Sequence, residues 1–504
     1  DSWNPAPDVS QTFNVAKATP TVTLKSSANP SAYGDAVHFT ARVSSPAATP
    51  DGTVQFSVNG TDVGTPVTLD GSGQAVSPDM STLALGTSIV HAAYSGSTDF
   101  TAAGSPFLIQ KVVKATPTVT VTSSSNPAAY GGLVHFTAQV TSAVGSPSGT
   151  VQFRLDGVNI GAPVALDSSG KAVSPDVSPN AGSHYARAFY SGDATFVPVA
   201  SAIVVQTVTK ATPTVTVTSS ENPSAYGDMV HFTAQVASGV GTPSGTVQFR
   251  VDGVNVGTPV ALDGSGQAVS PDMSLNAGYR YVRAFYSGSV NYAAAPSAVL
   301  GQTVTKATPT VTLTSSANPS AYGDTVHFTA QVASGVGTPT GSVQFRVDGV
   351  NVGAPVALDG SGQAVSPDVS PNAGNHNVRA VYLGSTNYTA VLSPVVVQTV
   401  TRVTPTVTVT SSANPSMYED PVHFTAQVAS GAGTPTGSVQ FRIDGVNVGS
   451  PVALDSSGQA ISPDMTPAPG NHNVRAVYQG SANFTSAMSA ILVQTVTRVV
   501  ATAG

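Results

Sequence analysis

Polar and apolar residues alternate along many short stretches of this chain, with the two-residue period of a half-buried β-strand. In residues 326–332, Val326, Phe328, Ala330 and Val332 fall on one face, and the residues between them are His, Thr and Gln. The same part of the chain predicts six more strands, in residues 308–314, 343–347, 352–358, 364–365, 378–382 and 394–401.

Sequences that favour turns separate these stretches. Asn318-Pro319 and Tyr322-Gly323-Asp324 precede the second predicted strand, and Asp348-Gly349 is a strong hairpin signal. No window of the chain shows the period of a helix. The pattern therefore predicts an all-β structure of short strands joined by tight turns.

This block of sequence occurs five times. Lys-Ala-Thr-Pro-Thr-Val begins at Lys17, Lys114, Lys210 and Lys306, and Arg-Val-Thr-Pro-Thr-Val begins at Arg402. A period of about one hundred residues is the size of a domain, so the chain is a string of similar domains. The predicted domains are residues 17–113, 114–209, 210–305, 306–401 and 402–498.

Seven short strands in a repeat of this size are typical of an immunoglobulin-like (Ig-like) β-sandwich. An eight-stranded up-and-down barrel is the alternative fold. It is less consistent with Lys-Ala-Thr-Pro, which recurs where one closed unit would pass to the next. We therefore predict a tandem array of five Ig-like sandwiches.

The repeated motifs also resemble a known family. Tyr-Gly-Asp-x-Val-x-Phe-Thr-Ala, Gly-Thr-Pro-x-Gly-x-Val-Gln-Phe and Gly-x-His-x-Val-Arg-Ala-x-Tyr are similar to the bacterial Ig-like repeats (group 3 type) of secreted and cell-surface proteins. The resemblance covers residues 17–498 and implies an extracellular module without catalytic residues. Family members often carry an aspartate before the final strand. Here only Asp193 keeps it, so a calcium site at that loop is implied in one repeat at most.

The first sixteen residues continue the repeat pattern backwards. An aromatic residue lies fourteen positions before each basic boundary, and Trp3 precedes Lys17 by the same interval. Residues 1–16 are thus either the last strand of a partial preceding repeat or a strand donated to a neighbouring molecule, and residues 499–504 are a terminal tail. The candidate inter-subunit strand comprises Trp3, Gln11, Thr12, Phe13, Asn14 and Val15.

The composition offers little catalytic chemistry. Charged residues make up only 9% of the chain, the net charge is −7, cysteine is absent, and the only glutamates are Glu221 and Glu419. These values disfavour nucleic acid as a partner and exclude thiol catalysis and paired-glutamate glycosidase chemistry. The repeated histidine typified by His327 points outward from its strand, and its copies lie too far apart to share a metal. We expect no catalytic, cofactor or metal site, and no enzymatic activity.

One face is a candidate for contacts. Arginines recur on the third and sixth predicted strands, which are neighbours in an Ig sandwich, and alternation points them outward. Two repeats add exposed aromatic residues there, which is typical of contact surfaces; a solvated face is the alternative. The candidate contact surface comprises Arg154, Tyr185, Arg187, Phe189, Arg250, Tyr281, Arg283 and Phe285.

The boundaries contain no flexible Gly/Ser tether, so we expect a stiff rod of about 200 Å. The function predicted is that of a secreted or cell-surface stalk or filament-building array. Its partners would be other copies of the chain, joined head-to-tail or laterally, or a surface glycan. The alternatives are an adhesin-type array that binds glycan or host protein, and an accessory region of a larger secreted enzyme. No run of residues is long enough to insert in a membrane.

Overall fold

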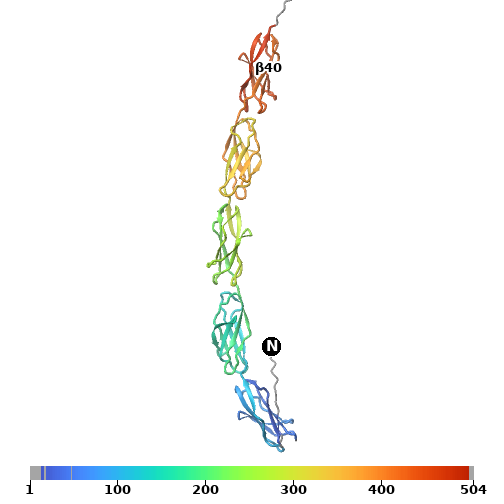
Figure 1. The fold of residues 1–504 in the computed structure, drawn as a ribbon, viewed down its shortest axis with the longest axis vertical. Coiled ribbons are helices and arrows are strands. Elements are labelled where there is room, and N and C mark those ends of the chain that lie inside the picture. Colours follow the sequence, from blue (N-terminus) through green and yellow to red (C-terminus); the bar gives the residue numbers. More distant parts are fainter. Residues whose placement is uncertain (1–12, 16–18, 47, 499–504) are drawn as a thin grey trace, which may run out of the picture.

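The computed structural model describes residues 13–15, 19–46 and 48–498, and shows five β-sandwich domains in a row (Figure 1). Domains 2 to 5 follow one another along a gently curved line, whereas domain 1 is turned away from it (Figure 1). The described residues contain no helix, and none of them forms a helical segment able to cross a membrane.

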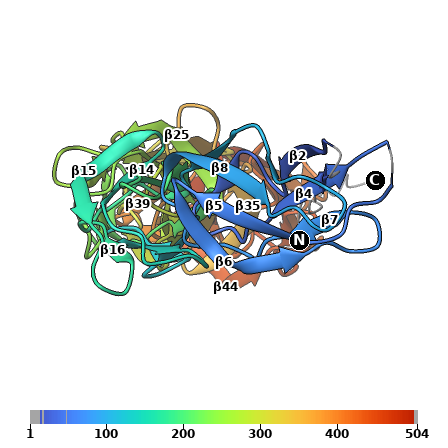
Figure 2. The ribbon, with the colours of Figure 1, turned by 90° about the horizontal axis from the view of Figure 1, so that it is seen from below.

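The strands recur in the same order in each domain. Domain 1 contains β2 (Thr21–Ser26), β3 (Ser31–Ala32), β4 (Phe39–Ser44), β5 (Thr53–Val58), β6 (Thr61–Thr68), β7 (Gln74–Val76), β8 (Gly86–Tyr94), β9 (Ala103–Gly104) and β10 (Leu108–Val113). Domain 2 contains β11 (Thr118–Ser123), β12 (Ala128–Ala129), β13 (Phe136–Thr141), β14 (Thr150–Leu155), β15 (Val158–Ala165), β16 (Lys171–Val173), β17 (Gly182–Tyr190), β18 (Val199–Ala200) and β19 (Val204–Thr209). In the view from below, β4, β5 and β8 of domain 1 lie to one side of β14, β15 and β16 of domain 2 (Figure 2).

Domain 3 has two additional short strands. It contains β20 (Thr214–Ser219), β21 (Ser224–Ala225), β22 (Met229–Val230), β23 (Phe232–Ala237), β24 (Thr246–Val251), β25 (Val254–Ala261), β26 (Gln267–Val269), β27 (Met273–Ser274), β28 (Gly278–Tyr286), β29 (Ala295–Pro296) and β30 (Leu300–Thr305). The additional pair, β22 and β27, corresponds to a single bridge such as Val326↔Val369 in the other domains.

The last two domains return to nine strands. Domain 4 contains β31 (Thr310–Ser315), β32 (Ser320–Ala321), β33 (Phe328–Ala333), β34 (Ser342–Val347), β35 (Val350–Ala357), β36 (Gln363–Val365), β37 (Gly374–Tyr382), β38 (Val391–Leu392) and β39 (Val396–Thr401). Domain 5 contains β40 (Thr406–Ser411), β41 (Ser416–Met417), β42 (Phe424–Ala429), β43 (Ser438–Ile443), β44 (Val446–Ala453), β45 (Gln459–Ile461), β46 (Gly470–Tyr478), β47 (Ala487–Met488) and β48 (Leu492–Thr497).

Each domain is a sandwich of two sheets. In domain 4 the smaller sheet has the order β31-β33-β36, and the larger has the order β32-β39-β37-β34-β35, with β38 paired to β37. The chain passes from the first sheet to the second between β31 and β32, through the cis bond Asn318–Pro319. The pairing of β34 with β37 places the third and sixth predicted strands side by side, as expected for an Ig-like fold.

The core lies between the sheets and is built by the alternation seen in the sequence. Phe328 and Ala330 of β33 face Phe345 of β34 and Ala380 of β37, and all four are fully buried. Tyr382 is also fully buried, and its hydroxyl donates a 2.5 Å hydrogen bond to the carbonyl oxygen of Thr340. Since a buried hydroxyl without a partner is costly, this bond explains how a tyrosine fits in the core.

The all-β prediction of five Ig-like sandwiches is thus confirmed, and each of the seven strands predicted in residues 308–401 is present. The alternation did not predict β32 and β38. Each has only two residues, which is too short for a period to be visible in the sequence.

The chain also has a strand ahead of domain 1. β1 (Phe13–Val15) pairs in parallel with β4, with Phe13 opposite Arg42. The donor-strand hypothesis therefore concerns residues that, in this single chain, extend its own first sheet. Trp3, Gln11 and Thr12 lie outside the described residues.

Candidate functional site

The repeated histidines of the second predicted strand form surface ion pairs. Nδ1 of His327 lies 3.4 Å from Oδ1 of Asp368, and the corresponding pairs of the other four domains lie at 3.0–3.1 Å. Each pair joins two residues of one domain. Across the described residues, no three His, Cys, Asp or Glu side chains gather closely enough to hold a metal ion. These histidines therefore have structural partners.

A second type of histidine spans two acceptors. In domain 4, Nδ1 of His376 lies 2.7 Å from Oδ2 of Asp348, and Nε2 lies 2.7 Å from the carbonyl oxygen of Asn372. Only a protonated imidazole donates from both nitrogens. The Asp348 hydrogen bond raises the pKa of His376, burial opposes this, and the Asn372 carbonyl adds to it. His184 in domain 2 makes the same two contacts, with Asp156 and Asn180.

Asp193, the candidate calcium ligand in domain 2, instead closes its own loop. Its carboxylate accepts hydrogen bonds from the backbone N–H groups of Ser148, Thr195 and Phe196, each at 2.8 Å, and from two hydroxyls. Burial opposes ionisation, but these N–H donors hold the pKa of Asp193 well below its usual range. Because calcium is bound by about six to eight oxygen atoms, this donor-rich surrounding does not fit a calcium site.

The candidate contact surface lies on the larger sheets of domains 2 and 3. Arg154 on β14 is directly opposite Arg187 on β17, and the guanidinium carbons lie 4.6 and 5.6 Å from the ring centroid of Phe189. Arg250, Arg283 and Phe285 repeat this arrangement in domain 3, with distances of 4.6 and 5.9 Å. The phenyl ring therefore lies within cation–π range of both like-charged groups.

Tyr185 and Tyr281 are the outward aromatic residues of the same surface, with 55% and 60% of their area exposed. Tyr281 also forms an edge-on contact with Tyr279, at 5.3 Å between ring centroids. All eight predicted surface residues thus lie on one sheet type in two adjacent domains. Their role in binding stays a prediction.

Domains 4 and 5 keep the arginines but lose the phenyl ring. Arg346 is opposite Arg379, and Val381 takes the place of Phe285. A surface hollow of about 600 Å³ lies over this pair, bordered also by Asn377 and Leu392. A similar hollow of about 370 Å³ lies over Arg442 and Arg475 in domain 5.

The ends of the domains make a second set of contacts, which we name junctions by the two domains they join. Tyr226 of domain 3 packs edge-on against Tyr388 of domain 4, with ring centroids 5.4 Å apart. Tyr130 meets Tyr292 at junction 2/3 in the same way, at 5.5 Å. Burial, with the neighbouring Tyr226, raises the pKa of Tyr388, whose hydroxyl donates to the carbonyl oxygen of Val336.

Two asparagines bond across each of these junctions. At junction 3/4, Nδ2 of Asn387 donates to Oδ1 of Asn276 at 3.1 Å, and Oδ1 of Asn387 accepts the N–H of Ala277 at 2.9 Å. Asn291 with Asn180, and Asn483 with Asn372, make the same contacts at junctions 2/3 and 4/5. Each junction therefore has two hydrogen bonds of fixed geometry between the domains.

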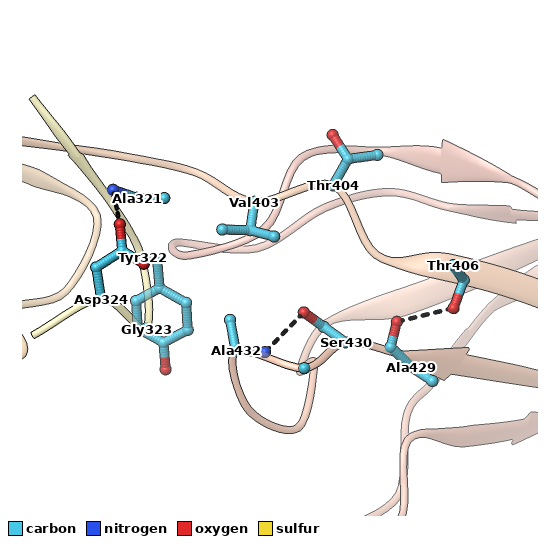
Figure 3. A pocket seen from close by; sticks show the side chains of 11 residues that line it. Ala321, Tyr322, Gly323, Asp324, Val403, Thr404, Thr406, Ala429, Ser430 and Ala432 are labelled. Atoms are coloured by element: carbon cyan, nitrogen blue, oxygen red, sulfur yellow. Dashed lines mark hydrogen bonds between the residues drawn. The ribbon is translucent and has the colours of Figure 1, made fainter.

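A glycine permits the close approach. Gly227 has φ +103°, and a Cβ atom added to it would lie 2.6 Å from Cγ1 of Val336 in the next domain. At junction 4/5 the smaller Ala432 replaces that valine. Figure 3 shows Ala432 facing Tyr322 and Gly323, beside a hollow of about 630 Å³ between the domains. Residues of both domains line this hollow, so it is part of the junction.

Junction 1/2 is different. Ala84 and Thr195 occupy the places of the two asparagines. Tyr33 packs against the core of domain 2, but among the described residues it forms no ring pair with Phe196. The glycine contact is kept, because a Cβ on Gly34 would lie 2.5 Å from Cβ of Val144.

The sequence analysis missed these junction residues. The signal was available: the asparagines of each pair lie 111 residues apart, and at junction 1/2 both are missing together. This spacing, however, relates residues of two different domains, and strand periodicity predicts contacts within one domain only.

The chain was compared with curated proteins and with solved structures. No curated protein matches the chain. Among solved structures, a tetra-tandem repeat from the extending region of a large adhesion protein is 17% identical, covering 76% of this chain and 98% of its own, with a TM-score of 0.43. A Ca²⁺-stabilised adhesin of an Antarctic bacterium, described as binding ice, is 16% identical, covering 76% and 100%, with a TM-score of 0.28. Likenesses this weak carry no argument about what the chain binds.

The family comparison is more specific. The model of the bacterial Ig-like domain (group 3) matches residues 23–113, 121–209, 217–305, 313–401 and 408–497. These five matches account for most of the chain, and each covers one domain from within its first strand to its last strand. The chain is a tandem array from the bacterial Ig-like domain (group 3) family.

Proposed function

We propose that this chain is a non-enzymatic, extracellular spacer, a stalk that holds whatever is attached to it at a set distance from a bacterial surface. The observation that carries the proposal is the repeated junction. A ring contact and an asparagine pair recur at junctions 2/3, 3/4 and 4/5. Contacts that fix one domain on the next favour an extended shape, which is what a spacer requires.

The side-chain chemistry supports a non-enzymatic role. The histidines at the two repeated positions described above have aspartate partners, and Asp193 has its oxygens occupied by donors of its own loop. A role as accessory region of a larger secreted enzyme is compatible with the same spacer behaviour.

Small-angle X-ray scattering of the purified chain tests the proposal. The expected result is the scattering of an extended rod, unchanged by dilution. The matched variant carries Asn291→Ala, Asn387→Ala and Asn483→Ala, which leave each sandwich core untouched and should shorten the average end-to-end distance. A wild-type chain as compact as a flexible string of beads would overturn the spacer role.

Self-association remains a separate proposal. If residues 11–16 join chains head to tail, electron microscopy of a concentration series will show filaments that disappear when residues 1–16 are deleted. Single rods at every concentration would contradict that proposal and leave the spacer role standing.

A further inference from the structure

The surface hollows of domains 4 and 5 combine unpaired positive charge with space. Arg346 and Arg379 lie directly opposite each other on neighbouring strands, where like charges repel. Nε of Arg346 donates to Oδ1 of Asn351 at 2.9 Å. The side chain of Arg379 has no hydrogen bond or ion pair with any described residue, and neither has the side chain of Arg475 in domain 5.

The carboxylate that borders the hollow already has partners. Asp348 borders the hollow, but its Oδ2 contacts His376 and its Oδ1 accepts the N–H of Asn377. In domain 5, Asp444 is held in the same way by His472 and Asn473. The arginines therefore have no anion of their own within the hollow.

Domains 2 and 3 show which side chain packs against such a pair of arginines. There the phenyl ring of Phe189 or Phe285 lies within cation–π distance of both guanidinium groups. In domains 4 and 5 the ring is replaced by Val381 or Val477, and the hollow opens. The phenyl rings of domains 2 and 3 thus indicate which kind of group fits the hollows of domains 4 and 5.

We propose that the hollows over Arg346/Arg379 and Arg442/Arg475 are binding sites for a six-membered ring that carries a carboxylate. The ring would lie where the phenyl ring lies in domains 2 and 3, against Val381 and Leu392. The carboxylate would accept hydrogen bonds from the free guanidinium group of Arg379, whose planar fork matches a carboxylate. This site is independent of the spacer role.

The ring with its carboxylate could come from an aromatic acid or from the uronic acid of a polysaccharide. Isothermal titration calorimetry on the full chain with benzoate and with galacturonate distinguishes the two. Benzyl alcohol and methyl galactoside, which lack the carboxylate, and inorganic phosphate, which lacks the ring, are the controls. The expected result is two sites per chain, with at least tenfold weaker binding of every control.

Native residue combinations provide variants that keep the fold. Val381→Phe with Leu392→Ala copies the pair Phe189/Ala200 of domain 2, and Val477→Phe with Met488→Ala does so in domain 5. Each should remove one site, and Phe285→Val with Pro296→Leu should create a third in domain 3. Arg379→Gln should weaken binding in domain 4 at least tenfold.

Several outcomes would overturn the proposal: absence of binding by both acids, equal binding of phosphate, or binding that survives in the chain with both hollows filled. None of these would change the scattering expected of a spacer. Conversely, a flexible chain that still binds two acids would reject the spacer and keep the sites.

Discussion

Junctions 1/2 and 2/3 join domains of the same fold, yet they differ in the number of contacts that fix one domain on the next. Junction 2/3 has the glycine contact, the Tyr130–Tyr292 ring pair and the Asn180–Asn291 hydrogen bonds. Of these contacts, the described residues of junction 1/2 keep the glycine contact and the packing of Tyr33. Domain 1 is also the domain that turns away from the line of the others (Figure 1).

The difference indicates that two groups of contacts have separate roles at a junction, one in close approach and the other in orientation. The glycine lets the domains come close, and it is present at all four junctions. The asparagine pair and the ring contact select one orientation, because hydrogen bonds and edge-on rings tolerate little rotation. Closeness without orientation gives a joint that can pivot, so we expect junction 1/2 to be the most mobile of the four.

The largest effect is expected from closing off the glycine contact. Gly227→Ala places a methyl group against Val336 and strains a residue at φ +103°, which alone costs about 1–2 kcal/mol. Junction 3/4 should open and become at least as mobile as junction 1/2. The chain has no cysteine, so Val254→Cys and Val350→Cys can carry spin labels as a unique pair.

Pulsed electron–electron resonance on this pair should show a broad distance distribution in Gly227→Ala and a narrow one in the parent. Gly335→Ala is the matched control, since a Cβ there meets nothing within 4 Å. If the distance distributions of both variants remain narrow, the close approach does not control the mobility of the junction.

A smaller effect is expected from exchanging the asparagines between the two junctions. Asn291→Ala removes two hydrogen bonds of about 0.5–1.5 kcal/mol each but leaves the Tyr130–Tyr292 contact, so junction 2/3 should become more mobile, though less so than junction 1/2. The converse pair, Ala84→Asn with Thr195→Asn, should narrow the distribution of label distances across junction 1/2. Labels at residues 61 and 158 report on junction 1/2, and labels at 158 and 254 on junction 2/3.

An unchanged junction 1/2 in the converse pair, with Asn291→Ala effective, would show that the asparagines need the ring contact beside them. In that case the missing ring contact of Tyr33, and not Ala84, makes junction 1/2 different.

The smallest effect concerns pH. His184 and His376 each contact the backbone carbonyl of the asparagine that serves junction 2/3 or 4/5, whereas Arg280 does so at junction 3/4. The pKa of both histidines is raised above 6.5, chiefly by the hydrogen bonds that their Nδ1 atoms donate to Asp156 and Asp348, while burial opposes the shift. The stability that these histidines contribute is therefore fully present below about pH 6.5, and it is lost as the pH rises through the higher folded-state pKa.

Raising the pH from 5.5 to 8.5 should thus destabilise junctions 2/3 and 4/5 by less than about 1 kcal/mol each. The distance distributions between labels across these two junctions should broaden slightly, and the distribution across junction 3/4 should not change. His184→Arg should make junction 2/3 as insensitive as junction 3/4. Equal broadening at all three junctions would assign the effect to some other group.

The sequence was a good guide to what lies within one domain. Alternation placed Phe328 and Ala330 in the core, and placed the arginines of neighbouring strands on one outward face, because strand period and sheet order determine both. It could not show that the ring of Phe189 lies within cation–π range of both Arg154 and Arg187, or that a hollow lies beside Val381. These depend on side-chain conformations across the sheet, and the junction contacts depend on how two domains are oriented.

Two of the three asparagines that donate a hydrogen bond across a junction have a consequence for how the protein is made. Asn387-Tyr388-Thr389 and Asn483-Phe484-Thr485 are acceptor sequences for N-linked glycosylation, whereas Asn291-Tyr292-Ala293 is not. A eukaryotic secretory host would attach a sugar to the same amide nitrogen that donates to Asn276 or Asn372. Material from such a host would carry a bulky group inside junctions 3/4 and 4/5 while junction 2/3 stayed closed. A bacterial host therefore yields the chain whose shape is relevant.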